Sequence, residues 1–528
     1  MTEWWRGAVV YQIWPRSFAD SDGDGIGDLR GVIGKLDYLA DLRVEGVWLS
    51  PFFTSPMADY GYDVADYCDV DPTFGTLADF DELLAEAHAR DLKIIIDQVY
   101  SHTSDQHAWF KESRQDRTNP KADWYVWAEA KEDGSPPNNW LSVFGGSAWA
   151  WDTRRRQYYL HNFLTEQPDL DFHNPEVQEA VLDVARFWLD RGVDGFRLDV
   201  ANYFFHDAEL RDNPEAGTLG HARPSQFQQH LYERSRPETL EFVKRLRTLL
   251  DSYGNRMAVA EIDSTSPTKR SIEYTEDRSL LHTAYNFQFL RADTLTPQLI
   301  RETVEEWEAT EAWPSWSFSN HDVRRAVTRW GGEEGGDVLA KQLLTLLCCL
   351  RGTVFLYQGD ELGLPQADLR FEDLRDPEAI RFWPEDLGRD GARTPMPWEA
   401  KAPHAGFTTG TPWMKIDDRH SQATAADQQA DAGSVLRHAQ AVLALRNSSQ
   451  ALRSGSISFR TTPSPLLVFE RHTDNETLLC AFNLSNEEIQ FDPGPQFEIL
   501  PVSVGGSQSE GRLVIAPRGS IIGRLGTR

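Results

Sequence analysis

The stretch Lys93-Ile94-Ile95-Ile96-Asp97-Gln98-Val99-Tyr100 indicates the fold class, because its apolar residues fall on both faces of an extended chain. Such strands are typical of a parallel sheet that helices cover on each side. Seven other short apolar segments of the chain also read as strands. The expected strands are Val9–Trp14, Gly46–Phe52, Lys93–Tyr100, Gly195–Val200, Met257–Ile262, Thr283–Phe289, Ser315–Asn320 and Thr353–Gln358.

Amphipathic segments separate these strands. In Leu77–Leu92 the apolar side chains recur at helical spacing, and Val177–Leu189 and Val338–Leu350 read the same way. Eight strands alternating with helices predict an α/β fold, a (β/α)8 TIM barrel rather than an open sheet. With 528 residues, the chain is long enough for one such barrel and smaller modules.

Two intervals interrupt the alternation. The long interval Ser101–Phe172 is rich in Trp, Pro, Asn and Gly, so we expect an inserted subdomain rather than a structureless loop. After Arg453, short β-type segments alternate with turns, which predicts a C-terminal antiparallel β-sandwich. Its expected strands are Ile457–Thr461, Leu466–Arg471, Thr477–Asn483 and Arg512–Ala516. The predicted domains are therefore a barrel (1–101 and 173–453), an inserted subdomain (102–172) and a C-terminal domain (454–528).

Composition narrows the function. A net charge of −29 argues against binding to nucleic acid or to an anionic membrane, which both require basic patches. No apolar run approaches the roughly 18 residues of a membrane span. The cysteines form no CxxC pair, which favours a reduced, cytoplasmic protein, and we expect a monomer or a weak homo-oligomer. These cysteines are Cys68, Cys348, Cys349 and Cys480.

Acidic residues end several of the predicted strands. Asp199 ends the fourth strand, Glu261 ends the fifth, and Asp322 follows the seventh. In this type of barrel the chemistry takes place at the carboxyl ends of the strands. Three acids on one rim repel one another unless a cation, a shared proton or a developing positive charge compensates.

Glycoside cleavage supplies that positive charge, because its transition state resembles an oxocarbenium ion. A retaining enzyme needs a carboxylate nucleophile and a carboxylic acid roughly 5–5.5 Å apart. Arg197 lies two residues before Asp199 and so points to the same face of a strand, where its charge would keep the nucleophile ionised. Glu261 must stay protonated at rest, which an apolar environment achieves by raising its pKa.

Five segments together resemble a known family. Asp97–His102, Gly195–Asp199, Ala260–Glu261 and Asn320–Asp322 resemble, in order and spacing, the four signature regions of glycoside hydrolase family 13, the α-amylase family. Gln167–Asp171 resembles its fifth region, in the form of the oligo-1,6-glucosidase and α-glucosidase branch. The resemblance extends from Trp4 to the C-terminal module, which is essentially the whole chain.

This resemblance implies roles for individual residues. Asp199 would be the nucleophile, Glu261 the general acid/base, and Asp322 the transition-state stabiliser that grips sugar hydroxyls. Further matching residues would line the pocket for the glucose that is released, the −1 site. These residues are His102, Arg197 and His321.

Four more positions match the substrate site of the family. Tyr62 matches the aromatic residue that stacks on the −1 glucose. Asp59 and Arg393 match a pair that closes the pocket behind the non-reducing end, which would restrict cleavage to terminal glucose. Val200 follows the nucleophile and would face the leaving sugar. In relatives a branched apolar residue there accompanies α-1,6 preference, so we expect activity on both linkages with a lean towards isomaltose; alternatively, Val200 only packs the strand end.

The chain departs from the family at two places. Ser101 stands where the family usually has an Asn that helps to bind calcium between barrel and insertion in α-amylases, so we expect that site to be absent. Asp171 stands where this branch usually has Asn, and no consequence of this difference can be derived.

An acidic loop near the N-terminus predicts a structural cation. Acids at positions 1, 3, 5 and 9 of the loop, with a backbone carbonyl at position 7, have the oxygen-rich, Gly-bent pattern of a calcium loop. Related α-glucosidases are similar here and hold Ca²⁺ or Mg²⁺. The expected ligands are Asp20, Asp22, Asp24, Ile26 (by its carbonyl) and Asp28. The alternative is a solvated acidic turn, since Gly31 stands where an EF-hand has its bidentate Glu. No organic cofactor is expected.

The sequence therefore predicts a retaining, exo-acting α-glucosidase that releases glucose from short α-glucosides by double displacement, with transglucosylation as a side activity. The alternative is a dedicated transglucosylase or a sugar isomerase, of the sucrose isomerase or trehalose synthase type, because the chemistry as far as the glucosyl-enzyme is shared. Heavy chains of amino-acid transporters resemble this fold too. They carry a membrane helix and lack the catalytic acids, so this reading is excluded.

Overall fold

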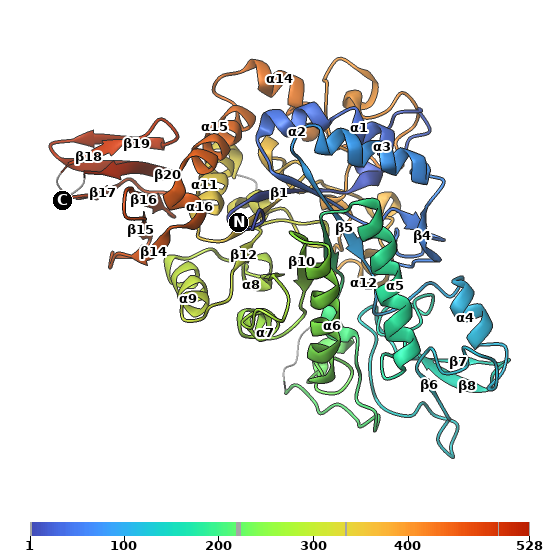
Figure 1. Ribbon diagram of the computed structural model, residues 1–528. Helices are drawn as coiled ribbons and strands as arrows, with labels where there is room; N and C mark the ends of the chain where they lie inside the picture. The colour runs from blue at the N-terminus through green and yellow to red at the C-terminus, as the bar shows by residue number, and fades with distance from the viewer. Residues whose placement is uncertain (1–2, 218–222, 333–334, 495, 527–528) are drawn as a thin grey trace.

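Eight parallel strands form a closed barrel in the computed structural model, which describes residues 3–217, 223–332, 335–494 and 496–526 (Figure 1). Around the barrel the strand order is β1-β13-β12-β11-β10-β9-β5-β2. The strands are β1 (Val9–Ile13), β2 (Gly46–Leu49), β5 (Lys93–Gln98), β9 (Gly195–Leu198), β10 (Met257–Glu261), β11 (Thr283–Tyr285), β12 (Ser315–Trp316) and β13 (Thr353–Tyr357). Each lies inside a predicted segment, so the (β/α)8 fold is confirmed.

The sixth and seventh strands are shorter than predicted. The segment Thr283–Phe289 is only partly a strand, because β11 ends at Tyr285 and helix α8 (Phe287–Leu290) follows. The side chain of Asn286 accepts a hydrogen bond from the Gln288 N–H and thereby starts this helix. The apolar residues expected to extend the strand are therefore helical.

Helices surround the barrel on its outside (Figure 1). The three predicted helices are present as α3 (Leu77–His88), α5 (Pro175–Arg191) and α11 (Gly336–Cys349). Among the described residues, every helix is too short or too polar to cross a membrane. Other helices of the barrel and of its loops are α1 (Leu29–Ile33), α2 (Leu36–Leu42), α6 (Glu238–Ser252), α7 (Pro267–Glu273), α9 (Pro297–Glu308), α10 (Ala326–Gly331), α12 (Pro377–Phe382), α13 (Asp418–Ser421), α14 (Ala425–Ala430), α15 (Val435–Ser448) and α16 (Gln450–Ser454).

The chain between β5 and α5 forms a small separate layer, which projects at the lower right of Figure 1. It contains a three-stranded antiparallel sheet in the order β6-β8-β7 and the short helix α4 (Ala108–Ser113). Trp140 and Trp149 stack within its own apolar core. The strands are β6 (Trp127–Ala128), β7 (Trp149–Asp152) and β8 (Gln157–Leu160).

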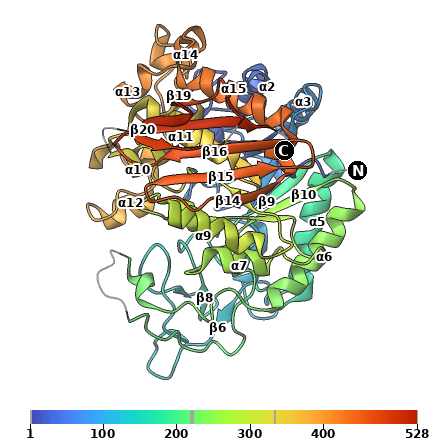
Figure 2. The same ribbon diagram turned by 90° about the vertical axis from the view of Figure 1, so that its left-hand side faces the viewer.

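The C-terminal residues form an antiparallel sheet, as expected, and Figure 2 shows its strands β20, β16, β15 and β14 side by side in front of α11. Its strands are β14 (Ser456–Phe459), β15 (Leu466–His472), β16 (Thr477–Asn483), β17 (Ile489–Phe491), β18 (Phe497–Ile499), β19 (Val504–Ser509) and β20 (Arg512–Leu525). The long strand β20 pairs with four of the others. Gln342 of α11 joins the sheet to the barrel by donating to the carbonyls of Asn483 and Gly519.

Candidate active site

The acidic residues predicted from the strand ends meet at one rim of the barrel. Glu261 is the last residue of β10, and Asp199 directly follows β9. The parallel pairing places Asp97 of β5 opposite Arg197 of β9. Because all eight strands run in the same direction, their carboxyl ends lie at the same edge of the barrel. Asp199 and Glu261 are only 6% and 8% exposed.

Arg197 is the centre of this cluster. Its fully buried guanidinium donates to Asp97 Oδ1 at 2.8 Å and to Asp199 Oδ1 at 2.6 Å, and it also contacts Glu261 Oε2. One cation therefore serves three carboxyl groups. The expected pairing of Arg197 with Asp199 is present, while its contacts with the other two acids were not anticipated.

The pKa values of these acids rise because the acids are buried. Burial raises the pKa of Glu261 to about 8 and that of Asp199 to about 7, although Arg197 lowers both. Arg197 lowers the pKa of Asp199, as expected, but burial outweighs this effect and the guanidinium is shared with two other acids. Burial raises the pKa of Glu261 further than that of Asp199, which suits an acid/base.

Asp322 differs from these two acids. Burial by itself would raise its pKa, but the contact of Oδ2 with His321 Nε2 at 3.0 Å and the charges of Arg393 and Arg389 lower it to about 2, so it is ionised. Arg393 donates to Asp322 Oδ1 at 2.7 Å and to the His321 carbonyl at 2.7 Å. The Asp322 side chain is 26% exposed, which leaves it able to contact a ligand.

His321 is held by an aromatic stack. Its ring contacts both Trp14 and Tyr62, with centroid distances of 5.1 and 5.5 Å, and these two rings also contact each other. Gln12 Nε2 lies 2.7 Å from Nδ1 and donates to it, so Nε2 carries the proton and lies 2.6 Å from the Tyr62 hydroxyl. Burial lowers the pKa of His321 well below its usual value, so the ring is neutral.

His102 lies next to this stack. Its Nε2 donates to the Tyr62 carbonyl at 3.0 Å, and the Ser101 hydroxyl lies 2.8 Å from its Nδ1. Burial lowers the pKa of His102 to about 4, so this ring is also neutral. Gln167 donates to Asp59 Oδ2 at 3.2 Å, which brings the fifth predicted motif to the same site.

Asp59 and Arg393, the pair expected to close the pocket, are held by separate ion pairs. Asp59 Oδ1 accepts from Arg389 at 2.8 Å, while Arg393 pairs with Asp322. Arg389 also binds Asp376 at 2.8 Å and lies 3.6 Å from Asp322.

Val200 has an unusual backbone. Its φ of 32° is in the left-handed region, which β-branched residues rarely adopt. The Val200 N–H lies 3.4 Å from Glu261 Oε2, and the side chain is 8% exposed. The strained turn after Asp199 thus places Val200 beside the predicted acid/base. Backbone strain of this kind often occurs at functional sites.

Sequence reasoning missed four residues of this cluster. Asp97 had a usable signal, because it ends an apolar strand as Asp199 does. Arg389 had a weaker one, since it lies in the same short segment as Arg393. Gln12 and Trp14 end the first strand, and the sequence carried no signal that they contact a histidine more than 300 positions away.

The acidic loop brings three of its four predicted acids together. One carboxylate oxygen from each of Asp20, Asp22 and Asp28 lies within 4.8 Å of the other two. Asp24 is not part of this group; its Oδ1 accepts from the Ile26 N–H at 2.7 Å. These carboxylate oxygens are the hard ligands that Ca²⁺ and Mg²⁺ prefer, so they fit such an ion.

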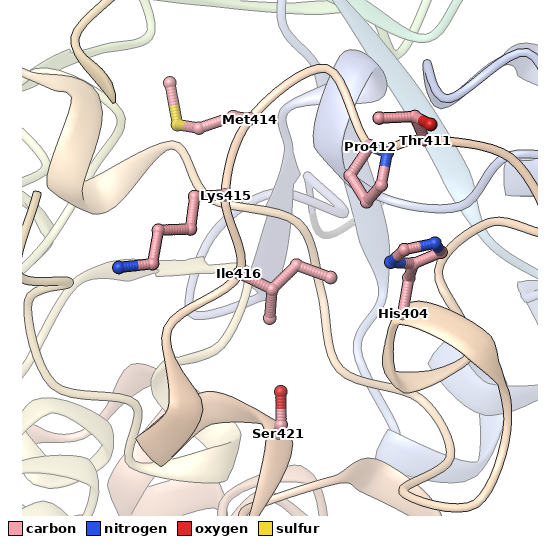
Figure 3. Close-up of a pocket in the computed structure, with 7 residues that line it drawn as sticks. All are labelled: His404, Thr411, Pro412, Met414, Lys415, Ile416 and Ser421. Carbon is pink, nitrogen blue, oxygen red and sulfur yellow. The ribbon is translucent and has the colours of Figure 1, made fainter. Parts of the chain in front are cut away.

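A separate cavity of about 380 Å³ lies in the loop segment that contains α13 (Figure 3). It is lined by His404, Thr411, Pro412, Met414, Lys415, Ile416 and Ser421. No carboxylate lines it, so it lacks the acid pair that glycoside cleavage requires.

Comparison with known proteins now identifies the family. The catalytic domain of alpha amylase matches residues 12–455. The chain belongs to the α-amylase family. Within this family it is 54% identical to a probable alpha-glucosidase of Rhizobium meliloti (strain 1021), over 92% of this chain and 90% of the relative. It is 40% identical to an oligo-1,6-glucosidase of Heyndrickxia coagulans, over 95% and 96% of the two chains.

A solved structure of the α-amylase family is also very similar. This alpha-glucosyl transfer enzyme, XgtA, has a TM-score of 0.96 and 53% sequence identity, with 100% of both chains covered. The relatives named as glucosidases support the assignment of this chain as a glycoside hydrolase that acts on glucosides.

Proposed function

We propose that this chain is a retaining, exo-acting α-glucosidase that releases glucose from the non-reducing end of short α-glucosides. The observation that most supports it is the sharing of one buried guanidinium, Arg197, by Asp199 and Glu261. Such sharing keeps two carboxyl groups close together, and double displacement needs a separation of roughly 5–5.5 Å. The unequal pKa values of the pair give one member the proton that the reaction requires.

In the first step, ionised Asp199 attacks the anomeric carbon while Glu261 gives its proton to the leaving glycosidic oxygen. The bond from carbon to that oxygen breaks, and a glucosyl ester of Asp199 forms. In the second step, Glu261 takes a proton from water, whose oxygen attacks the same carbon and releases Asp199. Asp322, ionised and partly exposed, would bind sugar hydroxyls more strongly as positive charge develops.

The charged cluster of Asp59, Arg389 and Arg393 would close the pocket behind the terminal glucose. Its side chains are nearly all buried, and they are held by ion pairs to one another, to Asp322 and to Asp376. A closed end leaves no space for a longer chain on that side. Lengthening a substrate beyond two or three glucose units should therefore raise kcat/KM only a little. The viscosity of soluble starch should fall only slowly.

The catalytic roles are tested by two substitutions that keep side-chain volume. Asp199→Asn should leave the fold intact and reduce kcat/KM below about a hundredth of the wild-type value. Glu261→Gln should do the same for maltose, yet retain cleavage of aryl glucosides whose leaving groups need no proton. Circular dichroism checks the fold of both variants. An Asp199→Asn variant with more activity than this limit would refute the assignment.

Transglucosylation is the second candidate, because the alpha-glucosyl transfer enzyme shares 53% of its sequence and the whole fold with this chain. The two functions differ only in whether water or a sugar hydroxyl attacks the glucosyl ester. Chromatography of the products from maltose, isomaltose and sucrose, with and without an added acceptor, separates them. We expect free glucose to predominate unless acceptor is abundant; isomerised sucrose would instead indicate a sugar isomerase.

We further propose that Asp20, Asp22 and Asp28 hold a structural Ca²⁺ or Mg²⁺ ion. When bound, the ion would neutralise the acidic loop, while the residues of this loop orient the chain after β1. Asp20 already fixes the loop by accepting hydrogen bonds from the N–H groups of Gly23 and Gly25. The enzyme is proposed to act in the cytoplasm, where its free thiols would stay reduced.

A further inference from the structure

A second cluster of metal-binding side chains lies outside both the active site and the acidic loop. Asp171 and His173 end the chain segment that leads into α5, and His206 lies in the loop after Asp199. One ligand atom of each of the three residues lies within 4.8 Å of the other two. Two histidines and one carboxylate form a donor set suited to zinc and similar borderline ions.

His206 provides the observation that points to a ligand. His206 is only 7% exposed. Among the described residues, no side chain or backbone group forms a hydrogen bond with its ring nitrogens. Its ring lies edge-on to that of His173, with the centroids 4.9 Å apart, so the two imidazoles already lie side by side. A metal ion in the cluster would supply that missing partner.

His173 is already oriented in the manner of a metal ligand. Its Nε2–H donates to the backbone carbonyl of His206 at 2.9 Å, which leaves the lone pair on Nδ1. Metal-binding histidines usually fix their ring in this way, with the second nitrogen donating to a carbonyl or carboxylate. His173 is exposed, so an ion from solvent can reach the cluster.

The spacing leaves room for an ion. Among the described residues no ion pair joins Asp171 to either histidine, so the acid is not already neutralised by them. An ion at the centre of three atoms within 4.8 Å of one another lies at most about 2.8 Å from each. Zinc bonds are roughly 2.0–2.2 Å long, so all three side chains must draw together around a bound ion.

We propose that Asp171, His173 and His206 bind a borderline divalent metal ion such as Zn²⁺. The ion ties the segment that leaves the inserted layer to the loop that follows Asp199. Three protein ligands leave a fourth position for water. The site differs from the acidic loop in its chemistry, because nitrogen ligands favour zinc whereas carboxylates alone favour calcium or magnesium.

The test is calorimetric titration of the full chain with ZnCl₂ after chelator treatment, in excess CaCl₂ so that the acidic loop is filled with a hard cation. We expect one zinc ion per chain. His173→Gln and Asp171→Asn should each weaken zinc affinity at least about tenfold, because each variant loses one of the three protein ligands. Zinc should also raise the Tm of the wild type, and raise it less in the two variants.

The matched control is His404→Gln, which removes another exposed histidine and should leave zinc affinity unchanged. Both test positions are at least partly accessible, so the variants should fold, and circular dichroism verifies this. Absence of zinc binding in calcium buffer would overturn the proposal. Equal affinity of wild type, His173→Gln and Asp171→Asn would overturn it too, because the zinc would then be bound elsewhere.

Discussion

At the scale of single residues, the sharing of Arg197 sets the pH dependence of the enzyme. Asp199 must be ionised to attack, and burial raises its pKa to about 7, so activity should rise as pH increases through this value. Glu261 must be protonated, and burial raises its pKa to about 8, so activity should fall above it. We therefore expect a narrow optimum of kcat/KM between these values, which belong to the coupled pair.

The measurement is a pH profile of kcat/KM on maltose, with an aryl glucoside as the control substrate. A good leaving group does not need the proton of Glu261, so the alkaline limb should weaken for the aryl substrate while the acid limb remains. An acid limb near pH 4 on both substrates would show that Asp199 has its ordinary pKa, contrary to the effect of burial.

Val200 is expected to influence linkage preference. It follows the proposed nucleophile, and its isopropyl group can pack on the flexible methylene of a 1,6 bond. Val200→Thr keeps the volume and the β-branching, so the backbone at φ 32° carries a similar cost in both proteins. In the wild type we expect kcat/KM to be higher for isomaltose than for maltose. In the variant the ratio of these two values should fall.

A single contact of this kind changes selectivity by roughly 10–200-fold, so the ratio is measurable. The hypothesis is wrong if the wild type prefers maltose, or if Val200→Thr leaves the ratio unchanged. In either case Val200 only packs the strand end.

At the scale of secondary-structure elements, a buried arginine joins the ends of three elements. Arg446 of α15 is fully buried and donates to the carbonyls of Gly7, Cys348, Leu350 and Gly352. These carbonyls lie just before β1, at the end of α11 and just before β13. Helix ends leave carbonyls without intrahelical partners, and the positive charge suits the carboxyl end of α11.

We expect Arg446→Ala to lower the free energy of unfolding by about 3 kcal/mol or more, because several buried carbonyls lose their donor. Urea denaturation measures the change. Arg437→Ala is the matched control, since this arginine is exposed on the same helix and its loss should cost about 0.5 kcal/mol or less. Equal losses in both variants would contradict the interpretation.

At the scale of the whole molecule, the acidic loop connects distant parts of the chain. Thr408 donates to Asp20, and the Trp413 N–H donates to the Gly25 carbonyl. A Cβ at position 25 would lie 1.9 Å from the Thr411 carbonyl, so glycine is required for this close approach. An ion that stabilises the loop thereby stabilises its contact with the segment around 408–413.

Chelation should therefore lower the Tm, and added Ca²⁺ or Mg²⁺ should restore it, because an ion bound only to the folded state stabilises that state. Asp22→Asn should reduce this response, whereas Asp474→Asn, in an exposed C-terminal turn, should preserve it. Differential scanning calorimetry with metal analysis measures both effects. An unchanged Tm and metal content after chelation and dialysis would contradict the site.

The sequence by itself determined the barrel, the position of its strands and the acids at their ends. Apolar runs and helical spacing are local patterns, and a strand places Arg197 and Asp199 on one face whatever surrounds them. The strands β17, β18 and β19 were not foreseen. The first two alternate apolar and polar residues over only three positions, β19 is mostly polar and glycine, and it is pairing with β20 that makes all of them strands.

Only the tertiary structure decided which charges pair and which protons are held. Asp59 binds Arg389, 330 positions later, because loops from opposite ends of the chain converge on one rim. The raised pKa of Asp199 has the same origin: burial and the sharing of Arg197 with two other acids arise from packing. Ion pairs and burial depend on contacts between distant segments, whereas strand and helix patterns depend on neighbours in sequence.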